Sequence, residues 1–289
     1  MGLRRAIQYL KMRLASIEEE VERQHRYFTN DFEPVRRLLP ENLEGLRALD
    51  VGCGNMLPAT ISLTGLGMHV TGIDIDPYEP PLRALPRRMK QEGKARALSM
   101  TARNMLVDGK VQRGLAARFP KPVSINTLDV RVMDAAKIEF PDNTFDLIFS
   151  TAVFEHIENM PAVLMEVYRV LKPGAVGRLH AHLWTSRTGS HTTEMMDERG
   201  ASLPVTPWEH LLNPQFRANC YLNFFRDVDY RRHIDETPLE IADWVRSTPD
   251  PREEALLEGE LGQQLEAKGY SREELLTTSL SMIVRKPAA

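Results

Sequence analysis

Two glycines and an acidic residue mark the end of the first β-like run of the chain, residues 46–52. Asp50 lies within this run, and Gly52 and Gly54 close it. A turn without side chains lets a ligand approach the backbone closely. The pattern therefore predicts a ligand-binding turn after the first strand.

A second acidic residue, Asp74, lies at the end of the next β-like run and is followed by Ile75. A carboxylate at this place can accept both hydrogen bonds of a ribose diol, as either a dinucleotide or S-adenosylmethionine would require. A nicotinamide dinucleotide fingerprint would want a third glycine at the position of Leu57. The sequence therefore disfavours a nicotinamide cofactor.

The elements that must position these residues are short β-like runs separated by helical or irregular stretches. No tight hairpin turn joins successive runs, so they predict parallel strands in a doubly wound α/β sheet. The runs cover residues 46–52, 69–75, 124–134, 145–150 and 176–184, and a last one ends at residue 286.

Further short motifs accompany the later runs: Asp134 and Ala135 after the third, residues 145–150 as the fourth, residues 154–157 just beyond it and residues 169–174 before the fifth. In this combination and order the chain resembles the class I methyltransferases, especially those with a methyltransferase type 11 domain. The resemblance covers residues 44–77 and 124–184, and the last run fits the antiparallel seventh strand of that family. It implies a Rossmann-like α/β fold with a seven-stranded, mainly parallel sheet and S-adenosylmethionine as the cofactor.

Carried over by position, the resemblance also implies roles for single residues. Gly52 and Gly54 would admit the methionine part of the cofactor, with Asp50 near its ammonium group. Asp74 would hold the ribose, and Asp134 would accept a hydrogen bond from the adenine amino group. The full predicted cofactor-binding set is Asp50, Gly52, Gly54, Asp74, Ile75, Asp134, Ala135 and Ser150.

Two histidines are candidates for the general base that an alcohol acceptor would need near neutral pH. His156 follows the fourth run, and His191 follows the fifth, where Gly189 could let a lid close over the acceptor. The alternatives are a structural or cofactor-side role for Glu155 and His156, and a surface loop without a role for His191. We take His191 as the first catalytic candidate and His156 as the second.

Two stretches outside the resemblance predict insertions that form a lid over the acceptor site, residues 79–121 and 185–252. The first is strongly basic and offers Arg87 and Arg88 to an anionic acceptor. A solvated basic helix pair, RNA or an acidic membrane surface would explain its charge as well. The second is rich in aromatic residues, among them Trp208, which could hold a sugar or form a small core of their own.

Apolar residues at three- and four-residue spacing predict an amphipathic helix in residues 1–40, ahead of a methyltransferase domain in residues 41–289. The apolar stripe could pack on the chain's own domain or form a dimer seam, which leaves a homodimer open. Its members are Ile7, Leu10, Leu14, Ile17, Val21 and Phe28.

The overall composition narrows the class of partners. A net charge of -3 and 42% hydrophobic residues over 289 residues give no global field for nucleic acid or membrane. No apolar run approaches the roughly 20 residues that span a bilayer, and the first residues are too charged for a signal peptide, so we expect a cytoplasmic protein without a DNA partner. Cys53 and Cys220 lack metal-ligand spacing, and the sequence predicts neither a disulfide nor a metal site.

These features together predict an S-adenosylmethionine-dependent methyltransferase that O-methylates a polar small molecule such as a sugar, a nucleotide-sugar or a glycan. The enzymatic alternatives are O- or C-methylation of a lipid or quinone-like natural product, and methylation of RNA. A further alternative is a cofactor-binding interaction subunit without activity of its own.

Overall fold

The computed structural model describes residues 16–76, 85–87, 89–90, 93–192, 194–196, 202–204, 206–213, 216, 218 and 220–288. Predictions for Ile7, Leu10, Leu14 and Arg88 lie outside these residues. The chain forms two compact units. The first comprises Met1–Phe140 with Thr144–Phe149, and the second comprises Pro141–Asn143 with Ser150–Ala289.

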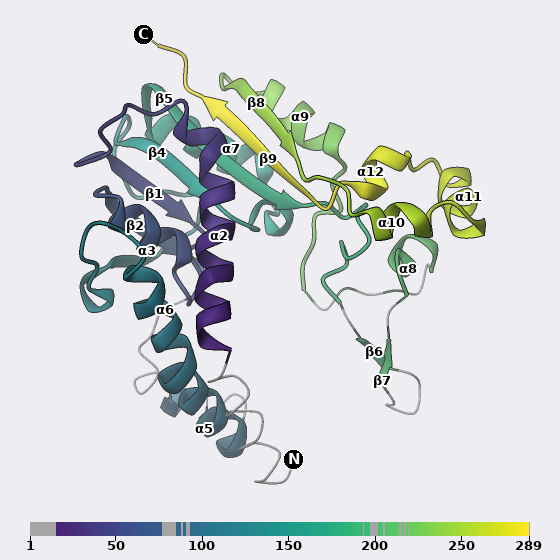
Figure 1. The fold of residues 1–289 in the computed structure, drawn as a ribbon. Helices are drawn as coiled ribbons and strands as arrows, with labels where there is room; N and C mark the ends of the chain where they lie inside the picture. Colours follow the sequence, from purple (N-terminus) through teal and green to yellow (C-terminus); the bar gives the residue numbers. More distant parts are fainter. Residues whose placement is uncertain are drawn as a thin grey trace. The chain divides into compact units, whose positions relative to one another are not determined.

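A seven-stranded sheet has the order β3-β2-β1-β4-β5-β9-β8 (Figure 1). The strand β1 is parallel to β2 and β2 to β3, whereas β9 is antiparallel to both β5 and β8. The predicted Rossmann-like, mainly parallel sheet with an antiparallel last strand is therefore confirmed. The strands are β1 Arg47–Val51, β2 His69–Asp74, β3 Asp129–Val132, β4 Phe145–Ser150, β5 Leu171–His182, β8 Glu240–Arg246 and β9 Ser279–Arg285.

Several predicted boundaries are wrong. The strand β8 lies inside the predicted insertion 185–252. The sequence did not reveal this strand, because its residues are largely exposed and do not form an apolar run. In the run 124–134 only β3 is a strand, and the 3-10 helix η2 (Ile125–Thr127) precedes it. The helices α10 (Pro251–Leu256) and α11 (Glu260–Ala267) follow β8.

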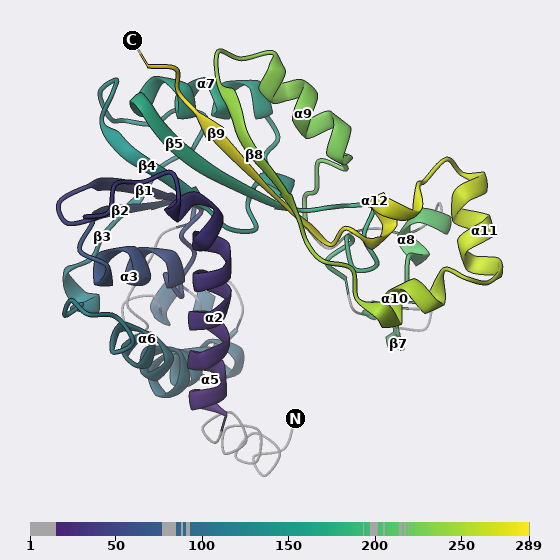
Figure 2. The same ribbon diagram turned by 45° about the horizontal axis from the view of Figure 1, so that its top comes forward.

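The first unit packs the helix α2 (Ile17–Arg36) along α6 (Gly109–Ala116) and against α3 (Pro58–Gly65) (Figure 2). Val21 of α2 packs with Val107 and Val111 in a small core. The approach is so close that a Cβ added to Gly114 would lie 2.6 Å from a methyl carbon of Val21. The described part of the predicted N-terminal helix therefore packs on its own unit.

The predicted basic insertion contributes packed structure to this unit. It contains α5 (Lys94–Arg103), the π-helix η1 (Asn104–Asp108) and α6. The guanidinium of Arg118 pairs with Glu18 and Glu22 of α2, and Lys121 pairs with Glu44 at 3.0 Å. Part of the positive charge is thus compensated by the unit itself.

The second unit contains α7 (Met160–Val170), α9 (Asp227–Asp235), the short helices α8 (Glu209–Leu212) and α12 (Arg272–Leu276), and the hairpin of β6 (Glu194–Met196) with β7 (Ser202–Pro204). The indole of Trp208 is fully buried and donates a hydrogen bond to the carbonyl of Thr185 at 3.2 Å. It anchors a small core with Leu211, Leu257, Leu265, Leu275 and Leu276. No described helix is long and apolar enough to cross a membrane.

Candidate active site

The turn after β1 is built without side chains that could block a ligand. Gly52 and Gly54 have φ angles of +72° and +59°, in the left-handed region that favours glycine. A Cβ added to Gly54 would have no atom within 4 Å, so the backbone is open on that side. Gln112 of α6 donates a hydrogen bond to the carbonyl of Asn55 at 3.1 Å, which supports the turn from within the unit.

Asp74 at the end of β2 is held by backbone N–H groups. Its Oδ2 accepts from Gly54 at 2.9 Å, and its Oδ1 accepts from Asp76 at 2.9 Å. Each oxygen keeps a further lone pair for a hydroxyl donor. The neighbouring Ile75 is 73% exposed, which is unusual for a large apolar side chain and leaves its surface available to a flat ligand.

Asp50 is buried within β1, with only 2% of its surface exposed. Its Oδ2 accepts a short hydrogen bond of 2.6 Å from the hydroxyl of Thr60 on α3. Burial raises the pKa of this carboxyl group to about 6, against the opposing effect of Thr60. A buried carboxylate of this kind would be stabilised by a cationic ligand group.

Asp134 and Ala135 follow β3, which pairs with β2 so that Val132 lies opposite Asp74. Asp134 is exposed, and its Oδ1 accepts a hydrogen bond of 2.8 Å from the N–H of Ala136. The first unit therefore gathers Asp74 and Asp134 at neighbouring strand ends. The donor set and the open glycine turn fit S-adenosylmethionine.

Ser150, the predicted cofactor residue at the end of β4, is fully buried. Its hydroxyl has no hydrogen-bond partner within the described residues, and its carbonyl accepts from Arg178 at 2.8 Å. The buried Arg178 also donates to the hydroxyl of Ser281 on β9 at 2.9 Å. Through these hydrogen bonds Arg178, on β5, connects the end of β4 with β9.

The second unit brings both predicted catalytic histidines to one place. The rings of His156, from the 3-10 helix η3 (Phe154–His156), and His191 have centroids 5.1 Å apart. The Nε2 atoms of these histidines lie 3.9 and 3.8 Å, respectively, from Oε1 of Glu155. The side chain of Glu155 is 3% exposed, and neither carboxylate oxygen has a hydrogen-bond partner of good geometry in the described part of the chain.

The electrostatics of this cluster follow from burial. Desolvation raises the pKa of Glu155, while the nearby His156 and the backbone amides of Glu155 and His182 oppose the rise. Desolvation also lowers the pKa of His191 to about 4, assisted by His182 and His156. His191 is therefore neutral at neutral pH.

The loop that presents His191 is tightly built. His191 has a φ angle of +55°, and its N–H donates to the carbonyl of Thr188 at 3.0 Å. A Cβ added to Gly189 would lie 2.3 Å from the carbonyl oxygen of Trp184. Gly189 thus serves close backbone packing in the structure, whereas the sequence suggested a hinge.

Two members of this region were not identified from the sequence. Glu155 was treated only as a cofactor-side or structural residue, and Cys220 was given no role. A ligand atom of His156, one of His191 and the thiol of Cys220 all lie within 4.8 Å of one another. Both cysteines are free.

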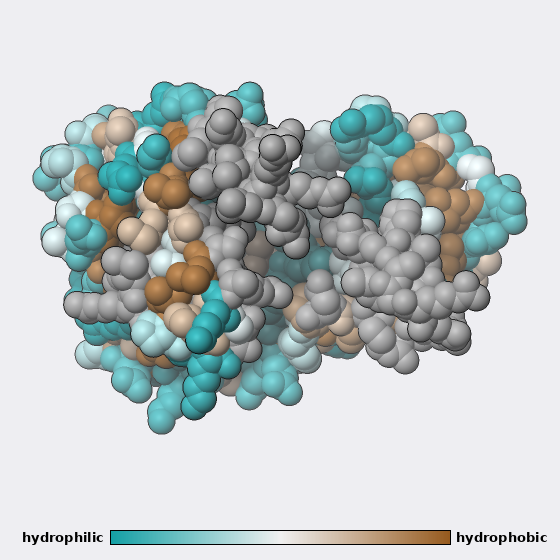
Figure 3. Space-filling view, turned by 90° about the horizontal axis from the view of Figure 1, so that it is seen from below, coloured by the Kyte–Doolittle hydropathy of each residue, from teal (hydrophilic) through white to brown (hydrophobic). Residues whose placement is uncertain are grey.

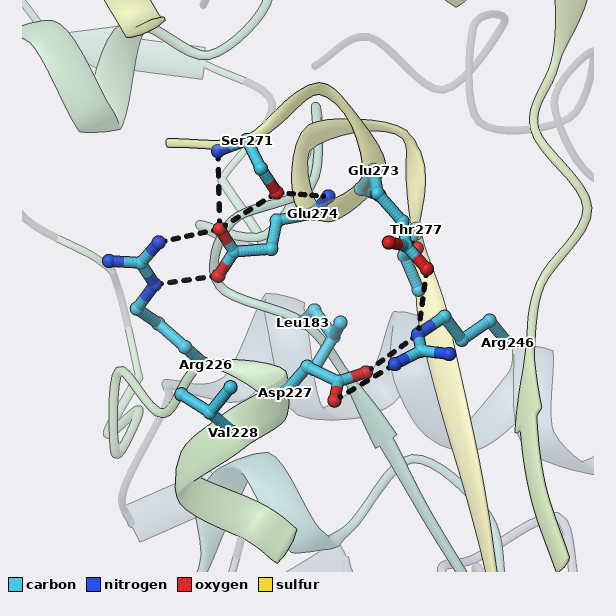
Figure 4. Close-up of a pocket in the computed structure, with 9 residues that line it drawn as sticks. All are labelled: Leu183, Arg226, Asp227, Val228, Arg246, Ser271, Glu273, Glu274 and Thr277. Carbon is cyan, nitrogen blue, oxygen red and sulfur yellow. Dashed lines mark hydrogen bonds and ion pairs between the residues drawn. The ribbon is translucent and has the colours of Figure 1, made fainter. Parts of the chain in front are cut away.

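A pocket in the second unit is lined by charged residues that already pair with one another (Figure 4). Arg226 forms two hydrogen bonds with Glu274, at 2.6 and 2.5 Å. Arg246 forms two with Asp227, at 2.9 and 3.3 Å. These pairs connect α9, β8 and α12, so we interpret the pocket as a structural junction of the unit.

The predicted acceptor-binding residues have different environments. Arg87 is exposed, Arg88 lies outside the described residues, and Trp208 belongs to a closed core. Apolar residues are exposed among polar ones on the face seen in Figure 3. Exposed apolar side chains of the predicted basic insertion are Leu98, Met105 and Leu106.

Residues 49–178 match the family model described as a methyltransferase domain. This segment is a class I methyltransferase domain. A putative S-adenosylmethionine-dependent methyltransferase from Listeria monocytogenes has a similar fold, with a TM-score of 0.50 and 15% identity, over 90% of this chain and 98% of that one.

Curated relatives match part of the chain. The sterol 24-C-methyltransferase ERG6A of Gibberella zeae is 26% identical over 142 residues, which cover 49% of this chain and 29% of that enzyme. The ubiquinone/menaquinone biosynthesis C-methyltransferase UbiE of Desulfotalea psychrophila is 35% identical over 72 residues, which cover 25% of this chain and 29% of that protein. The chain thus spans less than a third of either relative.

Proposed function

We propose that the protein transfers the methyl group of S-adenosylmethionine to a hydroxyl oxygen of a polar small molecule, such as a sugar or a nucleotide-sugar. The observation that carries this proposal is the cluster of Glu155, His156 and His191, in which buried proton-accepting atoms have no hydrogen-bond partner in the described structure. A hydroxyl must lose its proton to become a methyl ether, so a base in the site would assist it. A carbon or a neutral amine acceptor has no hydroxyl proton to lose.

The first unit supplies the cofactor side of the proposed reaction. Gly54 leaves the backbone open for the methionine part, and the buried carboxylate of Asp50 would pair with its ammonium group. Asp74 would accept from the ribose hydroxyls, and Asp134 from the adenine amino group. Strong charge-assisted hydrogen bonds of this kind fix both position and orientation.

The proposed acceptor-side residues are Glu155, His156 and His191. When bound, S-adenosylmethionine provides an activated methyl group, so the chain must mainly align the acceptor and remove its proton. The carboxylate of Glu155 would accept the hydroxyl proton. The acceptor oxygen would then take the methyl group, and the C–S bond electrons would stay with sulfur.

Aromatic side chains next to the cluster support a sugar-like acceptor. The carbonyl of Tyr221 lies 2.8 Å from Nδ1 of His156, and its side chain is 52% exposed. Phe224 is 54% exposed and meets the edge of Trp184 at a centroid distance of 4.6 Å. Exposed aromatic faces beside polar groups are common in sites that hold sugar rings.

A second candidate is C-methylation of a lipid or quinone-like acceptor. It is favoured by the names of the sterol and quinone methyltransferases that match part of the chain. These matches cover 49% and 25% of the chain, so they carry less weight for the acceptor. The two candidates differ in the atom that receives the methyl group.

The test is methyl transfer from isotopically labelled S-adenosylmethionine to two panels, one of sugars and nucleotide-sugars and one of lipid and quinone extracts. Mass spectrometry would identify the labelled product, and heteronuclear NMR would distinguish an O-methyl from a C-methyl group. We expect the label on oxygen. A C-methylated lipid would establish the second candidate, and a chain that fails to bind the cofactor in calorimetry would contradict both.

A further inference from the structure

Three metal-ligating side chains of the second unit meet although they are distant in the sequence. His156 follows β4, His191 follows β5, and Cys220 precedes α9. One ligand atom from each residue lies within 4.8 Å of the other two. In a tetrahedral zinc site with bonds of about 2.0 to 2.3 Å, donor atoms lie roughly 3.3 to 3.8 Å apart. Small side-chain movements would bring these three atoms to that spacing.

A second observation at the same place points independently to a cation. Glu155 is 3% exposed, and its two carboxylate oxygens lack hydrogen-bond partners in the described structure. The Nε2 atom of His191 is also buried without a partner there. Unpaired buried polar atoms are costly, and a buried carboxylate is usually paired with a cation or a metal. Oε1 of Glu155 lies within 3.9 Å of Nε2 of both histidines.

The orientation of His156 also suits a metal ligand. Its Nδ1 lies 2.8 Å from the carbonyl oxygen of Tyr221. A carbonyl can only accept, so this contact requires the proton on Nδ1 and leaves the lone pair on Nε2. Metal-bound histidines are commonly held in this way by a backbone carbonyl at the other ring nitrogen.

We propose that His156, His191 and Cys220 bind a zinc ion, with the carboxylate of Glu155 beside them to balance its charge. A thiolate with two imidazoles favours zinc over magnesium or calcium, which prefer oxygen ligands. Three protein ligands leave a fourth position open. The sequence predicted no metal site, because spacing along the chain does not reveal this arrangement.

This inference also deepens the proposed function, on which the following step rests. A hydroxyl acceptor could reach the open fourth position, since His156 and Cys220 are exposed. Its proton would then pass more readily to Glu155, because a zinc ion lowers the pKa of a bound hydroxyl group. Zinc binding itself does not depend on the identity of the acceptor.

The experiment uses the full-length protein, prepared with a chelator and a thiol-free reductant. Zinc binding is measured by competition with a chromogenic chelator, and cobalt is added separately as a spectroscopic probe. We expect one ion per chain, a thiolate-to-cobalt charge-transfer band, and intense d–d bands typical of tetrahedral coordination. His156→Ala, His191→Ala and Cys220→Ser should each weaken zinc binding on the order of 100-fold or more, and Glu155→Gln by about 10- to 100-fold, as for outer-shell partners.

His69→Ala is the matched control, because His69 is an exposed histidine at the start of β2. It should bind zinc as the unaltered chain does. Circular dichroism and calorimetry with S-adenosylmethionine would verify that each variant folds and binds the cofactor. A chain that binds zinc only weakly, or whose affinity is the same after all three ligand substitutions, would overturn the proposal. Zinc binding without methyl transfer to any hydroxyl acceptor would leave the metal site standing and contradict the proposed function alone.

Discussion

Replacing Asp50 by Asn tests both the buried carboxylate and its proposed contact with the cofactor. Asn keeps an oxygen that can accept the hydrogen bond from Thr60, now 2.6 Å from Asp50 Oδ2, but removes the charge. Burial raises the pKa of Asp50 from 3.8 to about 6 in the folded chain. A shift of this size, about two units, corresponds to roughly 3 kcal/mol between the two protonation states.

The sign of the effect on stability follows from this raised pKa. Between pH 4 and pH 6 the folded chain holds a proton on Asp50 that the unfolded chain has lost. The stabilising contribution of Asp50 is therefore complete below about pH 4 and is lost as the pH rises through about 6. Asn does not titrate, so the stability of Asp50→Asn should not show this loss. The difference in the free energy of unfolding, Asp50→Asn minus the unaltered chain, should therefore increase by up to roughly 3 kcal/mol between pH 4 and pH 8.

Cofactor binding should change in the opposite direction. The ammonium group of S-adenosylmethionine favours the ionised form of Asp50, so the affinity of the unaltered chain should increase as the pH rises through about 6. Asp50→Asn should bind the cofactor at least about tenfold more weakly at pH 8, with little of this pH dependence, since a charge-assisted hydrogen bond is worth about 1.5 to 3 kcal/mol.

Urea unfolding and isothermal calorimetry between pH 4 and pH 8 would measure both effects. Asp235→Asn removes an exposed carboxylate at the end of α9 and serves as the control. If the stability curves of Asp50→Asn and the unaltered chain run parallel over this range, the raised pKa is wrong. If Asp50→Asn binds the cofactor as tightly as the unaltered chain, Asp50 does not contact the ammonium group.

Four further variants test other parts of the structure. Asp74→Ala should weaken cofactor binding by about 1.5 to 3 kcal/mol in calorimetry, and unchanged affinity would contradict its ribose contact. His191→Ala should lower turnover on the order of 10² to 10⁴-fold with nearly unchanged cofactor affinity, because it removes the imidazole beside the proton-accepting carboxylate of Glu155, and wild-type turnover would remove it from the site. The double variant Arg87→Gln, Arg88→Gln should raise the KM for an anionic acceptor, and added salt should have the same effect. A KM that does not depend on salt would contradict a role for these residues in binding the acceptor. Trp208→Ala should lower the free energy of unfolding by about 3 to 5 kcal/mol in urea, and a loss below about 1 kcal/mol would contradict its place in the core.

The sheet could be predicted from the sequence where its strands are buried. The strand β4 is almost entirely buried, so its apolar run gives its bounds, Phe145–Ser150, without error. The strand β8 has exposed residues along most of its length, and it lies within a long stretch outside the family resemblance. Its place in the sheet depends on pairing with β9, a tertiary contact that local pattern does not encode.

The residues predicted to bind the cofactor share a position that the sequence does show. They lie at or directly after strand ends, and the carboxyl ends of parallel strands are where such folds bind ligands. The sequence did not reveal how Asp74 is held. Its two bonds to the N–H groups of Gly54 and Asp76 arise only when the turn after β1 adopts its positive φ angles.

The cluster around Glu155 could not be predicted, because each of its contacts depends on backbone geometry far from that residue. His191 reaches it through a left-handed backbone conformation that a β-like or helical pattern would never suggest. Cys220 reaches it from the segment before α9, more than sixty residues beyond His156. The backbone carbonyl of the neighbouring Tyr221 orients the ring of His156. Any residue type has such a carbonyl, so the sequence does not reveal this contact. Ligand spacing rules assume that a metal site is built from one local motif. The proposed zinc site takes its ligands from three separate segments of the chain. The sequence therefore identified the histidines singly as bases, and their meeting beside a buried, unpaired carboxylate is what favours a shared cation.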